Sequence, residues 1–443
     1  MSLRQYLPFV FLFLSGLVAG CASQSADRPR TSAQGTPFMD RVAESYVKLV
    51  LAVGQHDPDY VDAYYGPPEW RTEAEAKKRP LADLRAEAES LLGEFQAFPP
   101  ASDDEVVRLR HQYLVRQLQS MLARIDMLSG KRLTFDEESR ALYDAEAPRN
   151  SAEHFQQILD QLEKLVPGEG PLPDRVERFR QDFVIPRDRL DAVFQAGIDE
   201  CRRRTLEHVE LPPGESFEVE YVTGKSWSAY NWYKGNFHSL IQVNTDLPVF
   251  IDRVIDLACH EGYPGHHVYN ALLEKHLVRD RGWPEFSVYA LFSPQSLIAE
   301  GTANYGIEVA FPGEERVRFE SERLFPLAGL DPSTAERFYE VQRLMQELSY
   351  AGNEAARRYL NGDIKREEAA EWLVRYNLFE RERAEQRTRF FDQYRSYVIN
   401  YNFGQDLVRE YIERRGGTDS NPAKRWEEFE KLLASPRLPS GLR

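Results

Sequence analysis

Histidine and glutamate gather in one short segment of the sequence, HEGYPGHH at residues 260–267. Four of the nine histidines fall within residues 260–276, namely His260, His266, His267 and His276. Catalytic zinc sites use neutral imidazoles and carboxylates as three protein ligands and leave a further position to water. In an HExxH helix the glutamate beside the first histidine activates that water, so Glu261 is the predicted general base.

The spacing of the second histidine departs from that motif, because six or seven positions replace the usual four. On an unbroken helix, six positions turn the side chain of His266 by about 600° relative to His260, which puts it on another face. Seven positions bring His267 back to within about 20° of the His260 direction, but about 10 Å further along the helix axis. That separation is too long for two ligands at about 2.0–2.1 Å from one zinc ion. Pro264 cannot continue the helical hydrogen bonds, so a Pro264-Gly265 bulge would absorb two residues and make His266 the second ligand. His267 remains the alternative ligand or a flanking residue.

A third ligand is expected from the later segment SLIAEGTANYGIE at residues 296–308. Glu300 follows three apolar residues, so its carboxylate is predicted to be buried and to need a partner. Asn304 and Glu308 follow at four-residue steps on the same helix face and could hydrogen-bond the ligands. The competing interpretation pairs a buried Glu300 with an arginine. The combination with the histidine segment favours a single Zn²⁺ ion as cofactor, with three ligands: His260, His266 and Glu300.

The segments that must position these residues show mainly helical periodicity from residue 37 onward. Apolar residues recur at three- and four-residue steps in the ranges 38–53, 82–96, 104–128, 151–165, 174–206, 334–360, 365–377 and 382–401. Ser151 and Ser333 stand at expected helix starts. Two alternating segments, 216–222 and 238–243, predict strands of a small β-sheet next to the histidines. Its role stays open between an edge that accepts an extended peptide and a structural hairpin.

The domain organisation is expected to consist of two helical lobes. No clean linker divides residues 37–443. The simplest arrangement packs an N-terminal lobe, at about 37–210, on a metal-site lobe, at about 211–443, with the cleft between them.

The first 36 residues are expected to be a targeting region and not part of the fold. Arg4 precedes an apolar run at residues 6–19, and the following LVAGC resembles a bacterial lipobox that ends at Cys21. Residues 1–21 are therefore predicted to be a lipoprotein signal peptide, with a lipid anchor on Cys21 that attaches the chain to the membrane. Residues 22–36 are predicted to be a flexible tether. Ala22 favours the outer membrane, facing the periplasm; an ordinary secretory signal with an incidental cysteine is the alternative.

The composition limits the partners and the use of cysteine. A net charge of −15 repels phosphate backbones, so nucleic acid is not an expected partner, and no obligate protein partner is inferred. Beyond the predicted signal peptide the cysteines are Cys201 and Cys259, which form no CxxC pair. They are expected to be free, buried thiols, although an oxidising compartment would allow a disulfide between them.

The motifs resemble those of a known family. HEGYPGHH followed by EGxAxYxxE resembles the bacterial proteins grouped as domain of unknown function 885, which look like distant relatives of the gluzincin metallopeptidases. The resemblance covers most of residues 37–415, including QxxSY at residues 346–350. It implies a mainly α-helical, two-lobed metallopeptidase-like fold with a small β-sheet beside the metal site. It also implies zinc ligands and a general base at the positions named above.

The expected activity is zinc-dependent hydrolysis of a peptide bond in the cell envelope by an activated water. Glu261 would pass the water proton to the leaving amine. Tyr350, Tyr397 or Tyr401 could donate a hydrogen bond to the oxyanion, and Arg395 and Tyr397 could contact the substrate, Arg395 through a peptide carboxylate. The alternatives are hydrolysis of another amide and a catalytically silent envelope lipoprotein. Retention of Glu261 argues against the silent protein.

Overall fold

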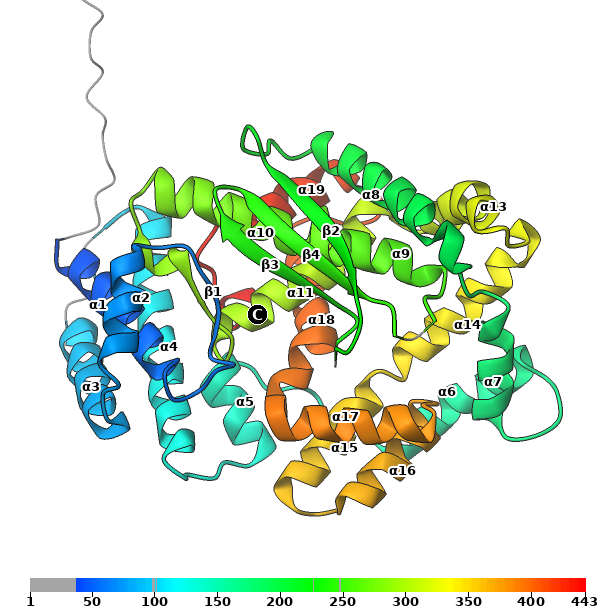
Figure 1. The fold of residues 1–443 in the computed structure, drawn as a ribbon, viewed down its shortest axis with the longest axis horizontal. Helices are drawn as coiled ribbons and strands as arrows, with labels where there is room; N and C mark the ends of the chain where they lie inside the picture. The colour runs from blue at the N-terminus through cyan, green and yellow to red at the C-terminus, as the bar shows by residue number, and fades with distance from the viewer. Residues whose placement is uncertain (1–36, 98–99, 101, 226, 247) are drawn as a thin grey trace, which may run out of the picture. The chain divides into compact units, whose positions relative to one another are not determined.

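Helices form at the ranges where apolar periodicity predicted them. The computed structural model describes residues 37–97, 100, 102–225, 227–246 and 248–443 (Figure 1). Its first helices are α1 (Pro37–Val53), α2 (Pro68–Ala76), α3 (Leu81–Ala97), α4 (Glu105–Leu128), α5 (Phe135–Tyr143), α6 (Ala152–Leu165), α7 (Leu172–Gln181) and α8 (Leu190–Leu206). The predicted signal peptide, its lipid anchor at Cys21 and the tether at 22–36 lie outside the described residues.

The second half of the chain is also mainly helical. The helices that follow are α9 (Asp252–Leu257), α10 (His266–Leu273), α11 (Pro294–Ala310), α12 (Glu315–Phe319), α13 (Phe325–Ala328), α14 (Ala335–Glu347), α15 (Tyr350–Asn361), α16 (Arg366–Tyr376), α17 (Arg381–Tyr394), α18 (Ile399–Arg414) and α19 (Pro422–Leu433). Two shorter pieces matter for the site: the π-helical segment η2 (Ala258–Gly262) and the 3₁₀ turn η7 (Arg395–Val398). The expected mainly α-helical fold is therefore confirmed.

Three of the expected helices are each divided in two. The range 174–206 breaks between α7 and α8, where Pro186 has no N–H to donate to a helix. The range 334–360 breaks between α14 and α15, and the range 382–401 breaks at Arg395, whose φ of 51° is left-handed. Apolar spacing does not register such local changes of backbone direction, so the breaks were not predicted.

The helix starts were only partly foreseen. Ser151 caps α6 as expected, because its hydroxyl accepts the backbone N–H of His154. Ser333 does not begin the later helix, since it lies within a 3₁₀ turn whose cap is Asp331. The aspartate two residues upstream thus takes the role predicted for the serine.

The two expected strands are present and belong to a three-stranded sheet. β2 (Ser216–Val222) runs parallel to β4 (His238–Asn244), and β3 (Ala229–Gly235) pairs antiparallel with β4 in the order β2-β4-β3. β3 was not predicted, because its sequence AYNWYKG lacks a clear alternation of polar and apolar residues. A second sheet pairs β1 (Val61–Tyr64) antiparallel with β5 (Val288–Ala290). Figure 1 shows β2, β4 and β3 in front of α10 and α11.

The core is centred on α11, which is buried on nearly every side and packs most extensively against α18. The backbones of these two helices touch. A Cβ atom on Gly301 would lie 2.5 Å from the carbonyl oxygen of Gly404, and one on Gly404 would lie 2.9 Å from the carbonyl of Leu297. Because neither position has room for a side chain, the contact holds α11 and α18 at a short, fixed separation.

The described residues belong to one compact unit. Helix α5 contacts α15 and η7, and α6 contacts α14, so elements from the two halves of the sequence pack together. The division into lobes near residue 210 stays an expectation. No helix in the described part of the chain is both long and apolar enough to cross a membrane.

The two cysteines are buried and free, as expected, and they lie side by side. The Sγ atoms of Cys201 on α8 and Cys259 in η2 are 3.0 Å apart. Burial, followed by the contact with Cys259, raises the pKa of the Cys201 thiol well above its ordinary value. The pair therefore marks the close packing of α8 on the segment that carries the histidines.

The Gly301 contact yields a stability prediction. Gly301→Ala places a methyl group against the backbone of α18, so the free energy of unfolding should fall by about 1–3 kcal/mol. Gly352→Ala is the matched control, because a Cβ on Gly352 of α15 meets nothing within 4 Å. This control should raise the free energy of unfolding by about 0.5–1 kcal/mol. Urea unfolding measures both variants, and equal values for the two would contradict the contact.

Candidate metal centre

A local change of helix geometry positions the first histidine. In η2 the backbone N–H of Tyr263 donates to the carbonyl of Ala258 at 3.0 Å, a π-type bond spanning five residues. The N–H of Gly265 then reaches the carbonyl of Cys259 at 2.9 Å, and α10 starts at the next residue. The interruption predicted from Pro264 is therefore present, and it absorbs the extra residues between the two histidines.

Gly265 is required where the chain turns into α10. A Cβ atom at this position would lie 2.0 Å from the carbonyl oxygen of His260 and 2.4 Å from that of Cys259. Real side chains cannot approach a backbone oxygen so closely, so the turn needs glycine. The glycine thereby sets how near His266 comes to His260.

His260 and His266 meet Glu300 as the sequence predicted. The imidazole centroids are 4.6 Å apart and their planes are nearly perpendicular. The Nε2 atom of His260 lies 3.3 Å from Oε2 of Glu300, and Nε2 of His266 lies 3.9 Å from Oε1. One ligand atom from each residue falls within 4.8 Å of the other two, the spacing of a three-ligand metal site.

The hydrogen bonds of the two Glu300 carboxylate oxygens show whether the site has room for a metal ligand. Oε1 accepts a hydrogen bond from the hydroxyl of Tyr397 at 2.8 Å. Oε2 is buried and has no hydrogen-bond donor among the described residues, because its contact with His260 lacks the geometry of a hydrogen bond. Buried carboxylate oxygens without donors are costly, and a cation would satisfy this one. Two imidazoles and a carboxylate are also the donor set that zinc prefers.

Asn304 determines which nitrogen of His260 faces Glu300. Its Nδ2 donates to the backbone carbonyl of Tyr401 at 2.9 Å, so its Oδ1 must face His260. Oδ1 lies 2.9 Å from Nδ1 of His260 and can only accept there. Nδ1 therefore carries a proton, so in the neutral imidazole the lone pair lies on Nε2, the nitrogen that faces Glu300. Asn304 thus occupies the supporting place predicted for it.

Glu261 lies beside the three residues and is 6% exposed. Burial raises the pKa of its carboxyl to about 7, with His260 opposing and Glu300 reinforcing the rise. Its backbone carbonyl accepts a hydrogen bond from Nδ2 of Asn231 on β3 at 2.6 Å. The glutamate is therefore held by both the π-helical segment and the small sheet. A carboxyl group that titrates near neutrality suits a general base.

Sequence reasoning missed a third carboxyl group near the site. Burial, followed by the charges of Glu300 and Glu261, raises the pKa of Asp62 on β1 to about 7. The hydroxyl of Tyr230 on β3 donates to Asp62. Asp62 stands in a four-residue strand with no motif around it, so the sequence held no signal for it. Asn231 and Tyr230 were missed because β3 itself was not predicted.

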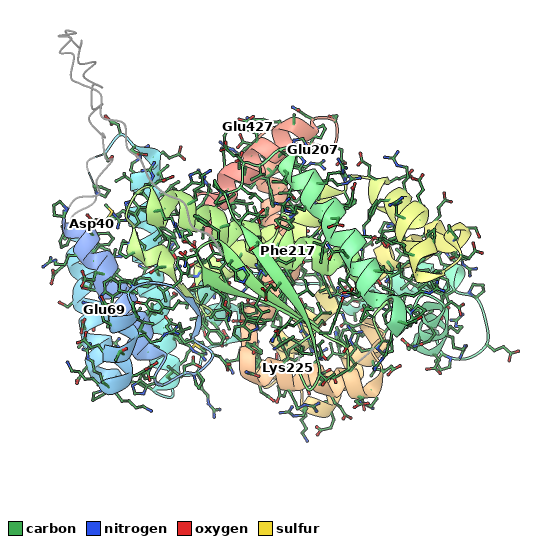
Figure 2. All side chains as sticks on the ribbon, turned by 45° about the horizontal axis from the view of Figure 1, so that its top comes forward. Asp40, Glu69, Glu207, Phe217, Lys225 and Glu427 are labelled. Carbon is green, nitrogen blue, oxygen red and sulfur yellow. The ribbon has the colours of Figure 1, made fainter. Side chains whose placement is uncertain are left out.

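His267, the alternative ligand, is fully buried. Its Nδ1 lies 2.9 Å from the hydroxyl of Ser239 on β4, and its Nε2 lies 2.9 Å from a carboxylate oxygen of Glu215. Phe217 on β2, labelled in Figure 2, packs its ring 5.3 Å from the His267 ring. Both nitrogens are engaged, so His267 joins the sheet to α10.

Of the remaining expected site residues, one contacts Glu300 and the others bond to residues elsewhere in the chain. Tyr397 is brought to Glu300, whereas the hydroxyl of Tyr350 donates to Asp406 at 2.5 Å. Arg395 pairs with the buried Glu138 at 2.6 Å. The two groups that were expected to bind oxyanion or substrate are therefore engaged with carboxylates of the chain itself. Glu308, expected beside the ligands, instead pairs with Arg409.

Comparison with known proteins supports the fold and assigns no activity. No protein-family model and no curated protein matches the chain, so the resemblance to domain of unknown function 885 stays a prediction. Among solved structures, the chain is similar to a protein described as a lipoprotein from Colwellia psychrerythraea, with a TM-score of 0.51 and 15% identity over 82% of this chain and 68% of that chain. That likeness shows a shared fold.

Two further solved structures match less closely. One is described as a lipoprotein of unknown function from Shewanella oneidensis, with a TM-score of 0.43 and 12% identity over 90% of this chain and 83% of that chain. The other is described as an oligoendopeptidase F from Bacillus anthracis, with a TM-score of 0.37 and 14% identity over 91% of this chain and 69% of that chain.

The contacts of His267 yield a second stability prediction. His267→Ala should lower the free energy of unfolding by about 1–3 kcal/mol, because the buried Glu215 and Ser239 lose a hydrogen-bond partner. His276→Ala is the control, since the His276 side chain is 37% exposed and should change the value by less than about 0.5 kcal/mol. Denaturant unfolding compares the two. A His267 variant as stable as the parent would rule out this structural role.

Proposed function

We propose that this protein is a zinc-dependent hydrolase that cleaves peptide bonds, with one Zn²⁺ ion held by His260, His266 and Glu300. The observation that carries the proposal is the buried Oε2 atom of Glu300, which lies 3.3 Å from Nε2 of His260 and has no hydrogen-bond donor among the described residues, while Oε1 lies 3.9 Å from Nε2 of His266. A structural zinc site would be closed by a fourth protein ligand. Here the three ligands stand next to Glu261, a carboxyl group suited to proton transfer.

The chemistry divides between the metal and the residues of the chain. A zinc ion, when bound, supplies a Lewis acid and lowers the pKa of water. Glu261 accepts a proton from the attacking water and delivers it to the leaving amine, a role that suits its pKa of about 7. Asn304 keeps the lone pair of His260 directed at the site.

Tyr401 is the phenol best suited to stabilise the oxyanion. Burial, followed by the charge of Glu300, raises its pKa well above the ordinary value, so the hydroxyl stays protonated and can donate. The hydroxyl of Tyr397 is already used by Glu300. No hydrogen bond in the described part of the chain engages the Tyr401 hydroxyl, which leaves it free to donate to a substrate oxygen.

We also propose that the protein works in the bacterial cell envelope, held at the membrane through Cys21. The support is the lipobox-like LVAGC sequence and the polar segment that follows it. In this setting the substrates would be peptides or related amides that reach the envelope.

Replacing the proposed base tests the catalytic role. Glu261→Gln preserves size but cannot accept the proton, so peptide hydrolysis should fall by about 10²- to 10⁴-fold while zinc content stays unchanged. Cleavage of a peptide library by the purified zinc-loaded protein, with and without chelator, measures activity, and elemental analysis measures zinc. Glu308→Gln is the matched control and should retain full activity. Unchanged hydrolysis by a zinc-loaded Glu261 variant would refute the assignment.

Zinc affinity tests the ligand set. His266→Ala should lose stoichiometric zinc, and Asn304→Ala should bind zinc about 10- to 100-fold more weakly, because His260 loses the acceptor that fixes its proton. Competition with a chromogenic chelator gives the dissociation constants. Asn402→Ala is the control, since Asn402 on α18 bonds to Asn353 at 2.9 Å and should leave zinc affinity as it is. Full zinc retention by the His266 variant would contradict the proposed site.

A further inference from the structure

We propose that one face of α17, with Arg387 and Arg383, forms a subsite that binds a carboxylate group of the substrate. The inference rests on the proposed hydrolase function and specifies its substrate as a peptide that bears a carboxylate near the scissile bond. Nothing in the sequence motifs pointed to these arginines. Arg180 of α7 and Arg253 of α9 add to the positive charge at this face.

The α17 face leads directly to the metal centre. Arg383, Arg387, Phe390 and Tyr394 recur at steps of three and four residues, so they share one side of the helix. The guanidinium carbon of Arg387 lies 4.2 Å from the Phe390 ring centroid, Phe390 lies 4.6 Å from Tyr394, and Tyr394 lies 6.1 Å from Tyr397. Tyr397 bonds Glu300. The neighbouring side of α17, about 100° around the helix, packs into the core through Ala384, Thr388 and Phe391.

The arginines of this group lack the carboxylate partners that arginines normally find. No ion pair within the described residues involves Arg180, Arg383 or Arg387, and each guanidinium lies over an aromatic ring instead, at 4.1 Å from Phe250, 4.4 Å from Phe379 and 4.2 Å from Phe390. The Nε atom of Arg180 is buried without a hydrogen-bond partner. Arg253 alone is paired, to Asp256 at 2.9 Å.

The missing counter-charges are notable because the protein is acidic. The chain has 71 Asp and Glu residues against 56 Lys and Arg, yet these three cations are left without a matching anion. Clustered guanidinium groups repel one another unless an anion joins them. An external carboxylate would provide that anion, and the planar fork of arginine binds carboxylates through two parallel hydrogen bonds.

The electrostatics of Arg383 agree with this picture. Burial, followed by the charges of Arg180, Arg253 and Arg387, lowers the pKa of its guanidinium to about 10, with Glu177 opposing. Arg383 nevertheless keeps solvent access, so a ligand can reach it. The charge of Glu300 raises the pKa of the Tyr401 phenol and the charge of Arg387 lowers it, so Tyr401 lies within electrostatic range of both the metal centre and the arginines.

Helix geometry limits where the carboxylate can stand on the substrate. Arg387 precedes Tyr394 by seven residues, which is about 10 Å along α17. An extended peptide rises about 3.3 Å per residue, so about three residues of the substrate would cover the stretch of α17 from Arg387 to Tyr394. Either a free C-terminus or an acidic side chain could supply the carboxylate.

Matched peptide pairs test the subsite and distinguish these two sources. One pair is acetyl-Ala-Ala-Ala with a free carboxylate and its C-terminal amide; the other is acetyl-Ala-Glu-Ala-amide and its Gln counterpart. Calorimetric titration of the zinc-loaded Glu261→Gln protein should show about tenfold or tighter binding of the charged member of at least one pair. The first pair reports a C-terminus and the second a side chain. Equal binding within both pairs would overturn the proposal.

Variants of α17 assign the preference to the arginines. Arg387→Gln and Arg383→Gln, singly and together, should reduce the charged-over-neutral preference towards one. Arg389→Gln, an exposed position on the same helix, should keep it. Since Arg383 is solvent-accessible, its single variant is expected to fold even where Arg387→Gln does not. Persistence of the preference in the Arg383 and Arg387 variants would reject the subsite.

The outcome separates this inference from the hydrolase proposal. A charge preference that depends on Arg383 and Arg387, in a protein that cleaves no peptide, would support the subsite and reject the hydrolase function. Peptide cleavage without any preference for charged peptides would support the hydrolase function and reject the subsite.

Discussion

The direct contact between the backbones of α11 and α18 fixes the spacing on which the candidate metal centre depends. Helices that meet through side chains lie about 8–10 Å apart. Gly301 and Gly404 remove the side chains at the crossing and bring the two backbones together. The short bonds from Tyr397 to Glu300, and from Asn304 to the carbonyl of Tyr401, both bridge the two sides of this contact.

A second constraint is the concentration of acidic groups around two imidazoles. Glu261, Glu300 and Asp62 lie in a shared buried environment, where carboxylates raise one another's pKa. The histidines offset part of this repulsion at Glu300, whose pKa they lower against the effect of burial. A low-dielectric interior makes such a set costly without a cation. The arrangement is therefore more easily understood as a ligand set with its base than as a structural cluster.

The residues near the motif were predictable because their chemistry is encoded locally. Pro264 and Gly265 predict a break in the helix, and this break brings His260 and His266 closer together than their six-residue spacing would. Asn304 follows Glu300 by one helical turn, so its side chain was expected on the same face. The mainly helical fold and two of its strands followed from periodicity in the same way. Each of these inferences needed only a short stretch of sequence.

Partners across long distances could not be predicted. Arg395 pairs with Glu138, which lies 257 residues earlier in the chain, and Tyr350 pairs with Asp406, and neither partner followed from the sequence around these residues. Asp62 reaches the site from a short strand near the N-terminal end of the described chain. The identity of such partners is decided by tertiary packing, which local composition does not encode.

The contact of Gly265 with the carbonyl of His260 also bears on how proteins of this kind are recognised. Two histidines that are neighbours in space are here six positions apart in the chain, because a backbone turn replaces part of a helix. A text pattern that fixes the second histidine four positions after the first passes over this sequence. Gene catalogues searched with that pattern will therefore undercount the helical proteins in which two histidines meet in this way, and a pattern with an optional Pro-Gly insertion would recover them.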